Sequence, residues 1–339
     1  MTQRFTPKNG CLLLFAVAIG AGLLRLLTTR TIGDDGYVVW ALAFPESRFL
    51  DFRLSAIFTA ALAGGCLGLS GLAFQVLLRN PLASPWVLGV SSGAGLGIML
   101  GLFLASLSGA ASILGSVLVA GQGSVGAALG ALLAVFIVQW LGRRLGGFDP
   151  VSLVLAGIIV SATFAAGIML LQHLVPYGLR DDLIGWMMGR ISETMPLGML
   201  VAAAILLGMC FIVGLKIVAA LDAACLGEDE ARSVGVDIDT LRIGLLVGGG
   251  ALATIAVVLA GPIAFVGLIA PHVARRLMGA GHRGLVPGSV FAGVVIMLVA
   301  EAARQWMVFG SGLLPIGVLT SLVGGPSFLV LLLRREQRQ

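Results

Sequence analysis

Few side chains in this 339-residue sequence could take part in catalysis or ligand binding, and their spacing excludes several common kinds of site. An ATP-hydrolysing phosphate loop needs a glycine-rich segment that ends in Lys and Ser or Thr. Neither Lys8 nor Lys216, the two lysines of the chain, stands in such a segment. The cysteines are widely spaced and mostly apolar in context, which is typical of packed core residues rather than of a disulfide framework or a metal site. They are Cys11, Cys66, Cys210 and Cys225. We therefore expect no catalytic residue, no metal ligands and no cofactor bound by this chain.

Acidic side chains inside apolar runs could carry protons across a membrane, and one of the 16 acids of the chain lies in such a position. Proton-driven transporters place acids or relays inside their membrane spans. Glu301 lies well inside an apolar run, but Arg304 follows three residues later on the same helix face. We interpret Glu301 as half of a local ion pair, with a proton site as the alternative. His173 and His272 are isolated and are interpreted as packed or capping residues.

The composition defines the elements that must carry these residues. The chain is 58% hydrophobic and 11% charged, whereas soluble domains are about 45–50% apolar and about 25% charged. This excludes soluble enzymes, nucleic-acid-binding proteins and disordered chains. The net charge of +5 fits the Lys and Arg that cytoplasmic loops of membrane proteins retain. The fold class expected is all-α, a polytopic helical membrane protein in a single domain covering residues 1–339.

Ten apolar runs approach the roughly 20 residues that a bilayer-crossing helix needs. The first run, beginning at Cys11, ends at arginines without a small-residue cleavage site, so we interpret it as a span and not as a signal peptide. Boundaries between the third and fourth spans, and between the seventh and eighth, rest only on glycines and on Gly261-Pro262. The predicted spans are 11–29, 54–78, 88–108, 120–141, 150–174, 194–218, 240–260, 262–279, 285–306 and 314–333.

Basic residues orient these spans. With the N-terminus in the cytoplasm, 14 of the 21 Lys and Arg residues lie inside and seven outside, which agrees with the positive-inside rule. The outside set is Arg25, Arg30, Arg48, Arg53, Arg180, Arg190 and Arg304. We expect both termini to be cytoplasmic.

Glycines recur at a spacing of four within the spans. Small residues at this spacing let helix backbones approach closely in a membrane. The pattern predicts a compact bundle and says nothing of a substrate. The glycines are Gly64 and Gly68, Gly89, Gly93 and Gly97, and Gly126 and Gly130.

The loop at residues 221–240 is unusual because it holds six acids where the inside rule favours bases. Acids at 228–230 suit the first turn of a helix, and Gly235 suits the left-handed position that ends it. Asp237 or Asp239 could cap a second short helix. We interpret the loop as a helix–turn–helix knob on the cytoplasmic side that docks a partner, with a solvated charged loop as the alternative.

Several multi-residue segments, in order, resemble the FecCD-type permeases, which are ABC importer subunits for ferric siderophores, haem and cobalamin. The resemblance covers roughly residues 50–330. The segments are RLS at 53–55, QVLLRNPLASPWVLG at 75–89, SSGAG at 91–95, LGEDEARSVGV at 226–236, GPIAFVGLIAPHVAR at 261–275 and LPIGVLTSLVGGPSF at 314–328.

The resemblance implies a type II importer fold of ten spans, in which two permease subunits, identical or paralogous, enclose a central pathway. It also implies two ATP-binding subunits that use ATP and Mg, and an extracytoplasmic substrate-binding protein, with no nucleic acid involved. The location it implies is a bacterial inner membrane. The 221–240 region would form coupling helices seated on the ATPase. The coupling residues implied are Leu226, Gly227, Glu228, Asp229, Glu230, Ala231, Arg232, Val234 and Gly235.

The resemblance also implies other sites. Arg53 and Arg304 match positions that dock acids of the binding protein, although interfacial snorkelling also explains them. Ala56 stands where the family often carries another arginine, which puts part of that docking in doubt. A cytoplasmic gate is implied at Asn80, Pro81 and Leu82, with Pro150 and Ser152 as a second candidate; an Asn-Pro pair also simply ends a helix.

The function implied is ATP-driven import of a metal chelate by alternating access, with a ferric siderophore favoured over haem or cobalamin. An ATP-independent secondary transporter or channel is the rival class. A signalling or assembly role lacks a soluble domain through which to act.

Overall fold

The computed structural model describes residues 5–32, 38–107, 109–120, 123–146, 150–175, 185–309 and 312–336. Within these ranges, seven helices are long and apolar enough to cross a membrane. They are α1 (Pro7–Leu27), α2 (Ser47–Leu77), α5 (Ser124–Gly146), α6 (Pro150–Leu174), α8 (Leu197–Lys216), α11 (Ile238–Ala260) and α13 (His282–Arg304).

Shorter elements complete the described chain. The helices α3 (Val90–Ala105), α12 (Val266–Met278) and α14 (Ile316–Glu336) lie at the other predicted spans; α3 and α14 are apolar, whereas α12 carries Arg275 and Arg276 in its last turn. The remaining elements are the 3-10 turn η1 (Pro85–Leu88), the helices α4 (Ala110–Val119), α9 (Val218–Leu226) and α10 (Glu228–Ser233), and the strands β1 (Thr28–Ile32), β2 (Val38–Leu42), β3 (Val308–Phe309) and β4 (Gly312–Leu313). Helix α4 fills what the sequence indicated to be a connection between the third and fourth spans, and the strands were not expected in an all-α chain.

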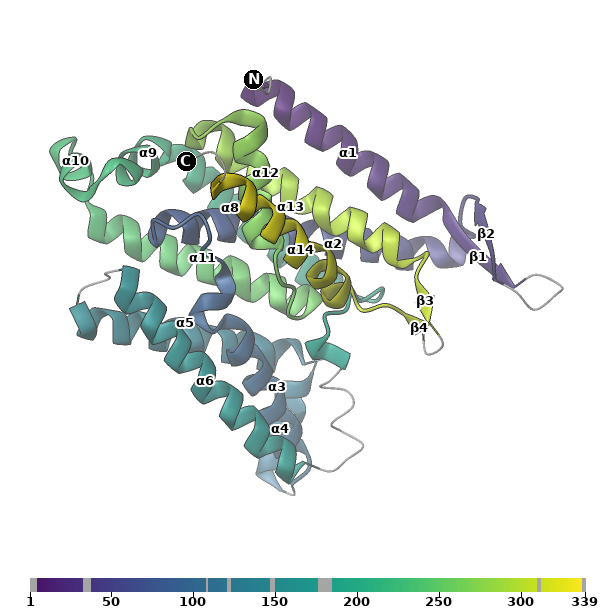
Figure 1. Ribbon diagram of the computed structural model, residues 1–339. Coiled ribbons are helices and arrows are strands. Elements are labelled where there is room, and N and C mark those ends of the chain that lie inside the picture. Colours follow the sequence, from purple (N-terminus) through teal and green to yellow (C-terminus); the bar gives the residue numbers. More distant parts are fainter. Residues whose placement is uncertain are drawn as a thin grey trace.

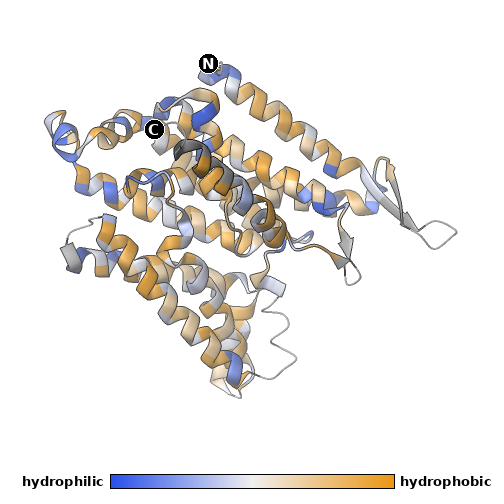
Figure 2. Cartoon of the chain, in the orientation of Figure 1, coloured by the Kyte–Doolittle hydropathy of each residue, from blue (hydrophilic) through white to orange (hydrophobic). Residues whose placement is uncertain are grey.

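Helices pack in two groups that α11 joins (Figure 1). Helix α2 is the most buried long helix, and it contacts α11, α12 and α13. Helices α3, α4, α5 and α6 pack on one another, and α11 touches α3 and α5 as well as α2. Helix α8 is the least buried long helix. Hydrophobic residues cover most helices, while the α10 region is largely hydrophilic (Figure 2). The chain is therefore a helical bundle with apolar outer faces.

The two ends of the bundle differ. The N-terminus of α1, the α9–α10 pair and the junction between α12 and α13 share one end, which we call the α10 end (Figure 1). The antiparallel pairs β1–β2 and β3–β4 lie at the opposite end, called the hairpin end. Basic residues occupy the last turns of α5, α8 and α12, and these turns face the α10 end.

Helix α12 has 13 residues, although the apolar run at 262–279 is longer. Pro262 disfavours a helical residue before it, and Phe265 adopts a left-handed φ of 66°, so the helix begins at Val266. Pro271 has no N–H to bond the carbonyl of Gly267. That carbonyl packs against Gly71 of α2, where a Cβ would lie 1.7 Å from the oxygen. The proline and the glycine together let α12 approach the central helix.

Glycines at the predicted spacing do pack helices closely. A Cβ on Gly97 of α3 would lie 1.9 Å from the carbonyl oxygen of Gly126 on α5, and one on Gly93 would lie 2.3 Å from that of Gly130. Gly89 serves differently, because it holds a left-handed φ of 73° at the start of α3. The compact packing predicted from the spacing is confirmed.

We expect Gly97→Ala to lower the stability of the bundle by about 1–3 kcal/mol, because its methyl group would force two backbones apart. The matched control is Gly208→Ala on α8, where nothing lies within 4 Å of the new Cβ. Alanine there improves helix propensity, so its stability should be unchanged or slightly raised. Thermal unfolding in detergent measures both variants, and equal melting temperatures would contradict the close approach of α3 and α5.

Candidate coupling and docking sites

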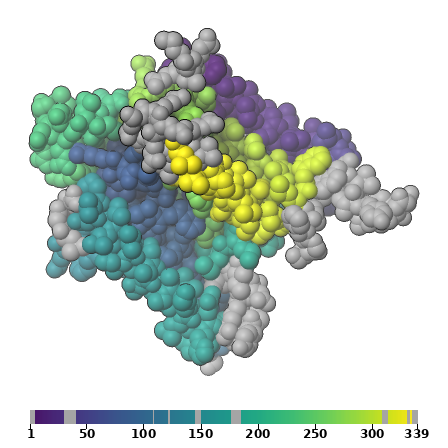
Figure 3. Space-filling view, in the orientation of Figure 1, coloured from purple at the N-terminus to yellow at the C-terminus, as the bar shows by residue number. Residues whose placement is uncertain are grey.

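Helices α9 and α10 form a knob, residues 218–235, that projects from the bundle (Figure 3). Glu228, Asp229 and Glu230 occupy the first turn of α10 as predicted, where they meet the positive end of the helix dipole. Gly235 ends the helix with a left-handed φ of 82°. Its N–H donates to the carbonyl of Arg232, and that of Val236 donates to Ala231, both at 3.0 Å. This is a Schellman motif, so the end of α10 is well defined.

The sequence suggested that Asp237 or Asp239 caps a second short helix. In the structure, Asp237 caps the long helix α11. Its Oδ1 accepts the N–H of Asp239 and of Thr240, and its Oδ2 accepts the Thr240 hydroxyl at 2.6 Å. These hydrogen bonds, that of the hydroxyl above all, hold the pKa of Asp237 below its ordinary value because they stabilise the charged form. The cap is therefore complete at neutral pH and is lost only in acid, as the pH falls through the lowered pKa.

Apolar side chains stand exposed on the knob. Leu226, two residues before α10, is 78% exposed and Val234, directly after it, is 69% exposed, whereas Ala231 within α10 is fully buried. Ala231 thus holds the knob together, and Leu226 and Val234 face outward. Two large apolar residues thus stand exposed next to the hydrophilic helix α10.

Some charged residues of the knob contact other elements of the protein, and the others are exposed. Glu228 pairs with Arg242 of α11 and with Arg79, which follows α2. Arg232 lies 4.0 Å from Asp239, and both side chains are exposed. Asp229 and Glu230 are also exposed. Asp222 of α9 accepts from the backbone N–H of His282 and lies 2.6 Å from His282 Nδ1, which fixes the knob to the start of α13.

The loop at residues 79–84 lies beside the knob, at the α10 end. Asn80 Oδ1 accepts the N–H of Leu82 at 2.9 Å, and the Asn80 carbonyl accepts that of Ala83, so the asparagine closes the turn around Pro81. Leu82 is 40% exposed. Pro150 is the first residue of α6, and Ser152 is half-buried. Helix α6 packs on η1, because Gly157 lies against the Val87 carbonyl. The two predicted gate segments are therefore joined through η1.

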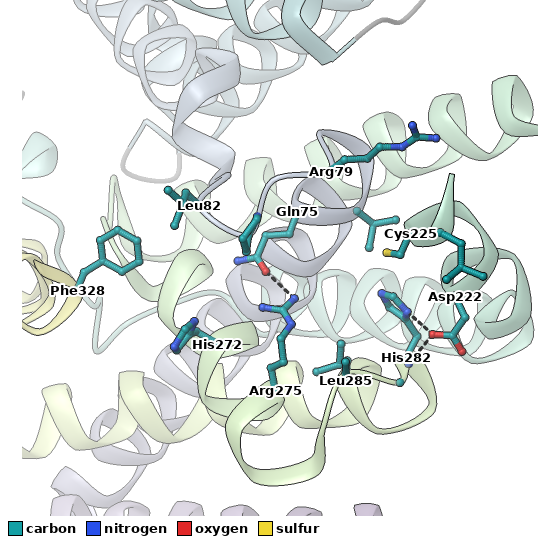
Figure 4. Close-up of a pocket in the computed structure, with 15 residues that line it drawn as sticks. Gln75, Arg79, Leu82, Asp222, Cys225, His272, Arg275, His282, Leu285 and Phe328 are labelled. Carbon is teal, nitrogen blue, oxygen red and sulfur yellow. Dashed lines mark hydrogen bonds and ion pairs between the residues drawn. The ribbon is translucent and has the colours of Figure 1, made fainter. Parts of the chain in front are cut away.

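A cavity of about 710 Å³ separates the 79–84 loop from α9, α12 and α13. Figure 4 shows Arg275 and Gln75 paired across it, at 3.1 Å, and Asp222 facing His282. His272 also lines this cavity and is half-buried. Its lining residues include Arg79, Pro81, Leu82, Cys225, Leu226 and Phe328.

A buried ion cluster occupies the hairpin end. Glu301 is fully buried, and its Oε1 accepts from Arg304 Nη2 and from Arg25 Nε, both at 3.0 Å. Arg25 also contacts Glu193 at 3.0 Å. The predicted ion pair between Glu301 and Arg304 is confirmed. Sequence reasoning missed Arg25, since it lies 276 residues from its partner.

The two predicted docking arginines differ in exposure. Arg53 is half-buried, and its Nη1 donates to the Leu26 carbonyl. Arg304 is only 4% exposed and is held by Glu301. Both lie at the hairpin end. Arg180 of the outside set falls outside the described residues. Among the residues described, no group of three or more His, Cys, Asp or Glu could hold a metal ion.

Comparison with known proteins gives one consistent result. The model of the FecCD transport family matches residues 10–334. The hemin transport system permease protein HmuU of Yersinia pestis is 33% identical, over 100% of this chain and 99% of that protein. The ferric enterobactin transport system permease protein FepD of Escherichia coli is 35% identical, over 85% and 82%. A solved structure, described as a metal-chelate type ABC transporter in an inward-facing conformation, matches with a TM-score of 0.79 at 27% identity and covers 96% of this chain and 98% of that one.

Proposed function

Because this chain belongs to the FecCD transport family, we propose that it moves a ferric siderophore into the cytoplasm as the permease subunit of an ATP-driven importer. It is a multi-pass membrane protein and an ABC permease of the metal-chelate class. The ATP-binding subunits, a second permease subunit and a substrate-binding protein are the partners this proposal requires. ATP and Mg bind to the ATPase subunits. This chain itself catalyses nothing.

One observation carries the coupling part of the proposal: the apolar residues Leu226 and Val234 stand exposed on the knob, next to the predicted gate loop. Burial of such side chains against a partner favours association. We assign the knob to the ATPase interface. The two termini and the knob would then face the cytoplasm, which agrees with the basic residues at the α10 end.

The mechanism we propose is alternating access. The binding protein delivers the chelate at the hairpin end, and ATP-driven closure of the ATPase pair moves the knobs of the two permease subunits. Movement of the knob shifts the helices around the central pathway and opens its cytoplasmic end. No metal-ligating side chains are required, because the cargo arrives already chelated.

Docking of the binding protein supplies one prediction. Arg53→Glu should weaken its affinity at least roughly tenfold, because a repulsive pair replaces an attractive one on the docking face. Arg304→Glu is not used for this test, because it would also break the buried ion cluster. The control is Arg48→Glu, which reverses the charge of an exposed arginine at the same end. The measurement is the dissociation constant of the binding protein for the permease immobilised in nanodiscs. An unchanged dissociation constant for Arg53→Glu would rule out this docking role.

Cargo identity is tested by uptake. Proteoliposomes that hold the complex, with its binding protein outside and ATP on the knob side, are offered a radiolabelled ferric siderophore, haem or cobalamin. We expect uptake of the ferric siderophore. Haem is the second candidate, supported by the 33% identity to HmuU over the whole chain. Uptake of haem alone would replace the siderophore assignment and leave the importer class intact.

A further inference from the structure

Glu228 brings three elements together at one oxygen atom. It is the first residue of α10, and its Oε1 contacts Arg242 Nη2 on α11. The same Oε1 lies 3.6 Å from Nη1 of Arg79, the residue that begins the 79–84 loop. The knob is therefore joined by one carboxylate both to a long helix and to the loop.

The two contacts differ in strength. The side chain of Arg242 is 9% exposed, whereas those of Arg79 and Glu228 are 35% and 38% exposed. Charges attract more strongly where water is excluded. The contact with Arg242 therefore anchors Glu228, and the longer, wetter contact with Arg79 can form and break as the loop moves.

Arg79 occupies a backbone position that normally favours glycine. Its φ is 47°, in the left-handed region. Its N–H donates to the Val76 carbonyl, and the N–H of Asn80 donates to the Gln75 carbonyl. This is the C′ position of a Schellman motif that ends α2, where glycine carries no Cβ penalty. An arginine here strains the backbone, so what it adds is its side chain, and that side chain reaches Glu228.

Room for movement lies behind the loop. The cavity of about 710 Å³ is lined by Arg79, Pro81 and Leu82 of the loop and by Leu226 of the knob. Apolar packing does not fill the space between loop and knob. A displacement of the knob can then reach the loop through the ion pair, while Asp222 and His282 hold the knob to α13.

We propose that Arg79 and Glu228 are positioning residues that transmit movement of the knob to the 79–84 loop. This inference rests on the proposed function, in which the knob is driven by an ATPase. It adds the connection between motor and gate: the carboxylate of Glu228 is fixed by Arg242 and pulls Arg79, and with it Asn80, Pro81 and Leu82.

The test uses the complete complex with its binding protein in proteoliposomes and compares Arg79→Gly with the wild type. Glycine suits the left-handed backbone, so the variant should fold with an unchanged or higher melting temperature. ATP hydrolysis should continue, while cargo moved per ATP falls by about fivefold or more, the size of a typical coupling between sites. Arg79→Lys keeps the charge and should restore most of the transport. Arg276→Ala removes an exposed arginine from the same end and is the control for charge loss.

A second readout separates transmission from simple stability. Spin labels at Leu82→Cys and at Ala219→Cys, an exposed position of α9 outside the predicted coupling residues, with Cys225→Ser, report the movement of loop and knob when ATP binds. In Arg79→Gly the knob should still move and the loop should not. Unchanged cargo per ATP, or an unchanged movement of the loop, would overturn the inference while the wild type still transports. If the wild type shows no ATP-driven uptake, the proposed function fails and this inference falls with it.

Discussion

Replacing Glu301 with alanine is expected to destabilise the protein by about 3–5 kcal/mol, because it leaves buried arginines without their shared partner. The side chains of Arg25 and Arg304 are 3% and 5% exposed, and both contact Glu301. Two guanidinium groups would then face each other out of water. Thermal unfolding of the purified variant in detergent measures the loss, which should also lower the yield from membranes.

Two further variants sharpen this test. Glu46→Ala breaks an exposed pair with Arg48, whose side chains are 66% and 71% exposed, and should cost about 1 kcal/mol at most. Replacing Arg25, Glu301 and Arg304 together by methionine removes all three buried charges and should recover most of the stability. A loss below about 0.5 kcal/mol for Glu301→Ala, which is the range of surface substitutions, would contradict the buried cluster.

The double variant Leu226→Asp with Val234→Asp is expected to separate the permease from its ATPase. Burying each of these side chains is worth about 1.5–3 kcal/mol, so losing both costs about 3 kcal/mol or more, roughly a hundredfold in dissociation constant. Folding should be preserved, since both residues are exposed in the permease itself. Binding of the purified ATPase subunit to the permease in nanodiscs gives the measurement.

Phe44→Asp is the matched control for the knob. Phe44 is 71% exposed two residues after the end of β2, and it carries a comparable apolar surface away from the knob. This control should leave ATPase binding unchanged. Equal ATPase binding by the double variant and the wild type would refute the assignment of the knob.

Local patterns predicted much of the fold and of the candidate coupling site. Glycines at a spacing of four indicated close helix packing, which Gly97 and Gly126 display. The acids at 228–230 and Gly235 marked the start and end of α10. The pair of Glu301 and Arg304 followed from a separation of three residues on one helix face. Each of these features depends on neighbours within one turn or two.

Features that depend on distant residues escaped prediction. The charge count places Arg25 in the outside set but gives it no partner, whereas the structure buries it against Glu301, which only the packing of α1 on α13 brings near. The sequence around Arg79 did not predict its left-handed backbone, because arginine is uncommon in that conformation. The apolar run at 262–279 predicted a longer helix than α12, which begins only at Val266 because of Pro262 and the left-handed Phe265. Hydropathy indicates which runs are apolar and how long they are, but not where a helix begins.

The most direct test of the central claim compares two energy sources for uptake of a radiolabelled ferric chelate. Proteoliposomes containing this chain, its partner permease and its ATPase are supplied with binding protein outside, and with either ATP on the knob side or an imposed proton gradient. We predict uptake that requires both ATP hydrolysis and the binding protein. Uptake by the chain alone, driven by the proton gradient without ATP, would contradict the account.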